Sequence, residues 1–144
     1  MLSPVEILAW LEENVKGMRR SRMKTLADIV PAAMEFRGVG VLSLGRAMET
    51  DTTCKHNIKR VNRFLGNEAF EGEALAKGIF EAFVPESARA LVLADWTDVP
   101  KGKLLLFSLP ANGRSIPFFT KVVAKKAGDG AMVRAENEAL EALQ

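Results

Sequence analysis

Cationic and amide side chains recur within residues 53–67 at the spacing of one helix face. At about 100° per residue, one arc is apolar and comprises Ile58, Val61, Phe64 and Leu65. The opposite arc has no Asp or Glu and carries Lys55, His56, Lys59, Arg60, Asn62 and Arg63. A solvated helix normally intersperses acids with bases and so gains i,i+4 ion pairs. Such a face can neutralise phosphates while Asn62, Arg60 or Arg63 reaches base edges in a groove. The pattern favours double-stranded DNA as the partner, and a basic face that is merely solvated is the alternative.

A carboxylate follows an apolar run that has the length of a strand. Residues 90–94 read Ala-Leu-Val-Leu-Ala, as expected of a strand buried on both faces, and Asp95 comes next. A carboxylate at the end of a buried strand is costly to leave unpaired and dry. Asp95 is therefore expected to cap the strand, to form a salt bridge or to bind a metal ion. Hard divalent ions normally need more than one carboxylate, so Asp95 alone does not make a site.

The single Cys and the single His limit the remaining chemistry. They exclude an internal disulfide and a structural zinc site. A hydrolase would have to use His56, and no carboxylate is placed by the sequence to orient it, so we interpret His56 as a phosphate contact or an exposed side chain. Cys54, near the start of the same helix, is interpreted as a packing residue.

Composition indicates an ordinary globular protein with an uneven charge distribution. The chain has 144 residues, 48% of them hydrophobic and 26% charged, which excludes disorder, collagen and coiled coil as overall descriptions. It contains neither an apolar run of membrane-spanning length nor a secretory leader, so we expect a cytoplasmic protein without membrane contact. The net charge is only +2, yet residues 1–66 carry 11 Lys or Arg against 7 Asp or Glu. A basic first half indicates a polyanionic partner.

Helices are predicted through the first 85 residues. Ser3 and Glu6 have the spacing of a capping box, and Pro31 is expected to kink or split the second helix, before a break at residues 37–40. A short helix to Met48 is followed by a turn, and Thr52 or Thr53 can cap a longer helix that ends at Gly66. This spacing is typical of a helix-turn-helix. Another helix is expected over about residues 69–83.

Strand patterns begin after Pro85. Three strands are expected over residues 90–94, 103–109 and 115–123. Asn112-Gly113 is a strong hairpin signal, and short connections predict an antiparallel meander. A final helix is expected from Ala131. The predicted class is α+β, with a helical domain over residues 1–86 and a second domain over residues 87–144.

Three segments taken together resemble the bacterial insertion-sequence transposases of the DDE class, and most of all the group that mobilises composite drug-resistance transposons. The first runs from Lys55 to Asn67 and reads Lys-His-Asn-Ile-Lys-Arg-Val-Asn-Arg-Phe-Leu-Gly-Asn. The second is Leu-Val-Leu-Ala-Asp-Trp-Thr-Asp at residues 91–98, and the third spans residues 109–121 with Asn-Gly-Arg-Ser at residues 112–115. The resemblance covers the chain from about Thr25 to its end.

The resemblance implies a fold and a chemistry. In that family an N-terminal helical domain binds the terminal inverted repeats of the transposon, and a ribonuclease H-like domain cuts and rejoins DNA. Two Asp and one Glu hold two divalent ions, Mg²⁺ or Mn²⁺, which activate the attacking oxygen and stabilise the leaving one. By position, Asp95 resembles the first Asp and would be both catalytic and a metal ligand. A homodimer on the transposon ends is the implied assembly, and the implied location is the bacterial cytoplasm in association with the nucleoid.

The sequence departs from the family pattern in its second half. The second Asp and the Glu of the family belong to a later strand and a later helix, beyond Gln144, and Asp98, Asp129 and Glu136 do not match those positions. We therefore expect the first three strands and one helix of an incomplete ribonuclease H-like domain, which by itself should not cleave DNA. Whether the chain is an enzyme stays open. The alternatives are a catalytically inactive module that inhibits a full-length transposase, and a structural interaction domain.

Overall fold

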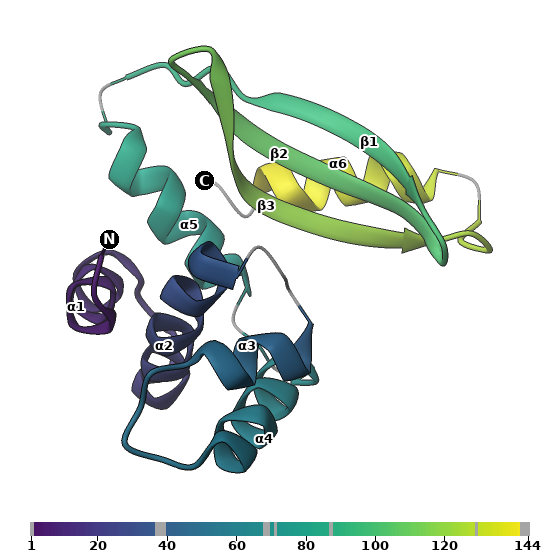
Figure 1. The fold of residues 1–144 in the computed structure, drawn as a ribbon. Helices are drawn as coiled ribbons and strands as arrows, with labels where there is room; N and C mark the ends of the chain where they lie inside the picture. The colour runs from purple at the N-terminus through teal and green to yellow at the C-terminus, as the bar shows by residue number, and fades with distance from the viewer. Residues whose placement is uncertain are drawn as a thin grey trace. The chain divides into compact units, whose positions relative to one another are not determined.

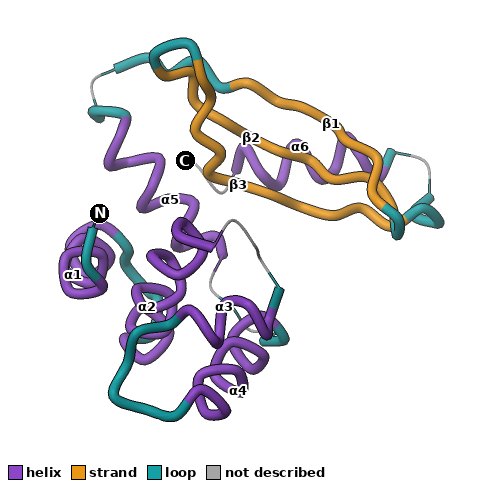
Figure 2. The backbone as a smooth tube through the Cα atoms, viewed as in Figure 1, coloured by secondary structure: helices purple, strands orange, loops and turns teal. Residues whose placement is uncertain are grey.

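The computed structural model describes residues 2–36, 40–67, 70, 72–86, 88–128 and 130–141. Within these ranges the chain forms six helices and a three-stranded antiparallel sheet, which confirms the α+β class (Figures 1 and 2). The chain divides into two compact units, unit 1 over Met1–Glu71 and unit 2 over Gly72–Gln144. None of the helices in the described ranges combines the length and the apolarity that a membrane span requires.

Unit 1 is helical and consists of α1 (Pro4–Asn14), α2 (Arg20–Phe36), α3 (Val41–Ala47) and α4 (Cys54–Leu65). The predicted capping box is present, since the Ser3 hydroxyl accepts from the Glu6 amide at 3.3 Å and the Glu6 carboxylate accepts from the Ser3 amide at 2.7 Å. The Ser3 backbone and side-chain hydrogen bonds lower the pKa of the Glu6 carboxyl. These bonds satisfy amides that the helix itself leaves without an acceptor.

Helices α2, α3 and α4 share one buried cluster, which comprises Ile29, Ala32, Leu44, Met48 and Val61. Pro31 lies inside α2, and the helix continues through it to Phe36, so Pro31 does not split the helix. Of the break predicted at residues 37–40, residues 37–39 lie outside the described ranges, and Gly40 is the N-cap of α3.

Unit 2 contains α5 (Gly72–Phe83), β1 (Leu93–Val99), β2 (Gly102–Ala111), β3 (Arg114–Ala124) and α6 (Ala131–Glu141). The strands follow the order β1-β2-β3 and pair antiparallel, which confirms the predicted meander. Asn112 and Gly113 have φ values of 46° and 76°, as a tight hairpin turn of the primed type requires. The predicted start of α5 at residue 69, the loop residue Asp129 and the last three residues lie outside the described ranges.

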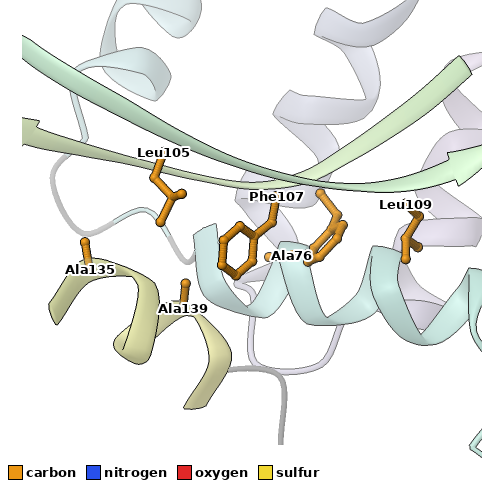
Figure 3. Close-up of a cluster of buried hydrophobic side chains, with 7 residues drawn as sticks. Ala76, Leu105, Phe107, Leu109, Ala135 and Ala139 are labelled. Atoms are coloured by element: carbon orange, nitrogen blue, oxygen red, sulfur yellow. The ribbon is translucent and has the colours of Figure 1, made fainter. Parts of the chain in front are cut away.

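One face of the sheet forms the core of unit 2. Leu105, Phe107 and Leu109 point from β2 toward α5 and α6, where they meet Ala76, Ala135 and Ala139 (Figure 3). The predicted domain boundary follows α5, whereas the two units divide before it. The reason is packing, because the Phe80 ring of α5 lies 5.3 Å from the Phe118 ring of β3.

The expectation of a doubly buried strand at residues 90–94 is wrong. Strand β1 begins at Leu93, and Leu91 and Leu93 are 67% and 42% exposed. Asp95 is therefore the third residue of β1, opposite Leu106 of β2, and does not lie at the end of the strand. An apolar run does not reveal how many faces of its sheet are covered, and among the described elements only one face of this sheet has helices packed against it.

Candidate nucleic-acid interface

Helices α3 and α4 approach each other closely at Gly45. A Cβ atom placed on Gly45 would lie 2.6 Å from the Cα of Ile58, which is too close for two carbon atoms that are not bonded to each other. The absence of a side chain at position 45 thus allows the backbones of the two helices to pack together. The short helix, the turn and the longer helix of the predicted helix-turn-helix are all present, and this contact holds the two helices in place.

The turn before α4 is tied to the helix by Asn57, which is 2% exposed. The Oδ1 atom of Asn57 accepts from the hydroxyls of Thr50 and Thr52 at 2.9 and 2.7 Å, and its Nδ2 donates to the Met48 carbonyl at 3.3 Å. This role of Asn57 was not predicted from the sequence. A signal was present in the sequence, because at about 100° per residue Asn57 falls on the apolar arc between Phe64 and Val61, and an amide on a buried arc needs hydrogen-bond partners.

The boundaries of α4 agree with the prediction. Thr53 is the N-cap, and its hydroxyl accepts from the His56 amide at 3.4 Å. The hydroxyl of Thr52, the other predicted cap, donates to Asn57 Oδ1 instead. Gly66 follows the last helical residue as the C-cap. Cys54, interpreted from the sequence as a packing residue, is exposed at the first position of α4, so this interpretation is wrong.

The outward side of α4 is here called the basic face and consists of Lys55, His56, Lys59, Asn62 and Arg63. All five side chains are exposed, and Val61 and Asn57 are buried on the opposite side. Among the described residues, Lys55 and Lys59 have no ion-pair partner. The Nε of Arg63 donates to the Lys59 carbonyl at 3.4 Å, which directs this side chain back along the helix. Positive charge is thus available to an anionic partner along about two turns of helix.

Arg60, the sixth predicted DNA-binding residue, lies apart from the basic face. Its Nη2 is 2.7 Å from the Oδ2 of Asp28 on α2, and the two side chains are 21% and 22% exposed. This ion pair joins α4 to α2 within unit 1. The guanidinium of Arg60 is therefore already bound to a carboxylate, unlike the ammonium groups of Lys55 and Lys59.

The second predicted site, Asp95, is an exposed carboxylate on β1. Within the described ranges it accepts from the Thr97 hydroxyl at 3.5 Å, which is at the limit of a hydrogen bond. Asp98 pairs instead with Lys103 at 3.1 Å, and Glu136 accepts from the Trp96 indole at 2.7 Å. Across the described ranges, no three His, Cys, Asp or Glu side chains come together as metal ligands. Asp95 in this arrangement does not fit a Mg²⁺ or Mn²⁺ site, which needs several oxygen ligands.

No protein-family model matches the chain, and neither a curated protein nor a solved structure matches it. Function is therefore inferred from the residues and the geometry described above.

Proposed function

We propose that this chain is the DNA-binding portion of a bacterial transposase of the DDE class, and that α4 binds the terminal inverted repeats of the element. The observation that carries the proposal is the basic face of α4, where four ionisable bases and one amide are exposed with no acid among them. An α-helix is about 10–12 Å across, and the major groove of B-DNA is about 12 Å wide. A helix held from behind by α2 and α3 can enter that groove with its basic face forward.

Salt dependence follows from this mode of binding. Each phosphate neutralised by a Lys or Arg releases condensed counterions, so the logarithm of the affinity falls with the logarithm of the salt concentration by about 0.9 per contact. We expect Lys55, Lys59 and Arg63 to account for a slope of about −2 if two of them contact phosphates and about −3 if all three do.

The test is a titration of a labelled random-sequence DNA duplex, followed by fluorescence anisotropy between about 50 and 200 mM salt. The variant combines Lys55→Ala, Lys59→Ala and Arg63→Ala, and it should bind more weakly and with a shallower salt slope. The control combines Lys101→Ala, Lys125→Ala and Lys126→Ala, which removes the same charge from exposed positions of unit 2. Affinity that is flat with salt, or equal losses in the two variants, would contradict the proposal and favour a structural interaction domain.

The proposal extends to catalysis only in a complete protein. There, Asp95 would be one carboxylate of a triad that holds divalent ions, and those ions would supply the charge for phosphoryl transfer. The isolated carboxylate of Asp95 among the described residues favours the second candidate function, a DNA-binding module that occupies transposon ends and inhibits a full-length transposase. A nicking assay with Mg²⁺ or Mn²⁺ distinguishes the two, because nicking that disappears in Asp95→Ala would exclude a pure binding module.

We further propose that two copies of the chain bind each pair of transposon ends. Inverted repeats present the same half-site twice in opposite orientation, and a two-fold pair of identical proteins matches that symmetry. Analytical ultracentrifugation on a duplex that carries both repeats should give two chains per duplex.

A further inference from the structure

The five residues of the basic face are arranged symmetrically about Lys59. At about 100° per residue, Lys55 and Arg63 lie about 40° to either side of Lys59, and Asn62 and His56 lie about 60° to either side. Lys59 is thus at the centre of the face. Lys55 with Asn62 forms one flank, and Arg63 with His56 forms the other.

A helix in the major groove presents its centre and its flanks to different parts of the DNA. Because the helix nearly fills the groove, its flanks meet the two phosphate backbones and its centre meets the base edges at the floor. Phosphate contacts fix the position of the helix without reading sequence, and only contacts to base edges specify it. A cation on each flank is therefore expected to bind phosphate, and a cation at the centre is expected to contact base edges.

Other polar side chains of α4 are engaged away from the central position. Arg60 is held by Asp28 at 2.7 Å, and Asn57 is buried in the turn. Arg63 donates to the Lys59 carbonyl at 3.4 Å, so its side chain lies along the flank. Lys59 is exposed, without an ion-pair partner in the described ranges, and has the most direct path to the floor of a groove.

We infer that Lys59 is the specificity-determining residue of α4, and that its ammonium donates to the O6 and N7 atoms of a guanine in the recognised duplex. The inference rests on the proposed function, since it assigns tasks within the DNA-binding face. Lys and Arg are the side chains that pair with the two guanine acceptors in the major groove. Lys55 and Arg63 bind phosphates of the two strands and contribute affinity without sequence preference.

The experiment starts with selection of bound duplexes from a random-sequence library by the unmodified full chain. Affinities are then measured for the selected duplex and for a scrambled one. Lys59→Ala should lower the ratio of these two affinities by about 5- to 100-fold, the discrimination of one good base contact. Lys55→Ala and Arg63→Ala are the matched controls, since each removes one exposed charge from the same helix. They should weaken binding to both duplexes alike and leave the ratio within about twofold.

A second measurement identifies the atom that is read. Replacing the recognised guanine by 7-deazaguanine removes the N7 acceptor and should weaken the unmodified chain but not Lys59→Ala. Circular dichroism checks that each variant is folded, as expected of changes at exposed positions.

The failures are distinguishable. If the unmodified chain binds no duplex, the proposed function itself is wrong. If it binds duplexes but selects no sequence, or selects one without a guanine, the assignment of Lys59 is overturned. The assignment is overturned too if 7-deazaguanine weakens Lys59→Ala as much as the unmodified chain, or if Lys55→Ala lowers the affinity ratio equally.

Discussion

Asn57 and Arg60 are polar residues of α4 that face inward, and each is satisfied by a partner from another part of unit 1. Asn57 bonds three groups of the preceding turn, and Arg60 pairs with Asp28 of α2. A buried polar group without a partner costs free energy, so these bonds also determine how α4 is seated. The polar residues of α4 therefore divide into an inner set that positions the helix and an outer set that can meet DNA.

Replacing Asn57 by Ala should destabilise unit 1. The change removes three hydrogen bonds and leaves the Met48 carbonyl without its donor, so we expect a loss of about 2–3 kcal/mol in the free energy of unfolding. Urea unfolding of the full chain, with hydrogen exchange of peptides from α4, measures the effect. The control is Asn62→Ala, the exposed amide of the same helix, which should change stability by less than about 0.5 kcal/mol. Equal effects of the two variants would show that the Asn57 bonds do not stabilise the turn.

The Arg60–Asp28 pair should contribute to stability and not to DNA binding. Because both side chains are about four-fifths buried, we expect Arg60→Ala and Asp28→Ala each to cost about 1–3 kcal/mol, and the double variant to cost less than the two single losses combined. Measured on folded protein, the affinity of Arg60→Ala for DNA should stay closer to that of the unmodified chain than the affinity of Lys59→Ala does. A shallower salt slope in Arg60→Ala with unchanged stability would instead make Arg60 a phosphate contact.

At the scale of elements, the ends of α4 and the β2–β3 hairpin could be predicted from the sequence, because interactions between neighbouring residues determine them. Thr53 and Gly66 mark the ends of α4 because cap hydrogen bonds connect residues within one turn. Asn112 and Gly113 mark the hairpin for the same reason. The basic face follows from helical spacing alone, so five of its six predicted members share an exposed surface.

Long-range pairing could not be predicted in the same way. Asp28 is 32 residues from Arg60, and no local spacing indicates that pair. Strand β1 begins where its pairing with β2 begins, at Leu93 opposite Ser108, and the apolar run at residues 90–94 does not reveal that pairing. The helix α5 has apolar spacing that would suit either unit, and only its packing on β3 assigns it to the second.

The crossing of α3 and α4 should be sensitive to Gly45→Ala. Alanine favours a helix over glycine by about 1 kcal/mol, but its Cβ would overlap the Ile58 backbone, so the helices must move apart. We expect a net destabilisation of about 1–3 kcal/mol by urea unfolding, together with weaker binding of duplex DNA. Gly40→Ala is the control, because the added Cβ would meet only the Ser43 Oγ at 3.7 Å. A more stable Gly45→Ala variant would mean that the two helices are not in close contact.

At the scale of the whole molecule, the two candidate sites belong to different units. The basic face is in unit 1, and Asp95 is in unit 2, each unit with its own buried cluster. The proposed binding to DNA through α4 would use phosphate and base contacts of the basic face and would need no divalent ion. Strand transfer chemistry would require one, together with further carboxylates around Asp95. On the proposed function, we therefore expect DNA affinity and any metal dependence to be separable by mutation.

Asp95→Ala should consequently leave DNA binding unchanged. At matched ionic strength, the unmodified chain and Asp95→Ala should bind the selected duplex within about twofold of each other, both with Mg²⁺ and with EDTA, because on the proposed function the basic face of α4, and not Asp95, supplies the DNA contacts. Anisotropy titrations measure the affinities, and a supercoiled plasmid reports any nicking in the same buffers. Asp98→Ala is the control, since it removes a carboxylate from the same strand that is already paired with Lys103. Mg²⁺ could instead tighten binding in the unmodified chain and in Asp98→Ala but not in Asp95→Ala. That result would mean that Asp95 binds a metal ion that contacts the DNA, and the expected independence of the two sites would be wrong.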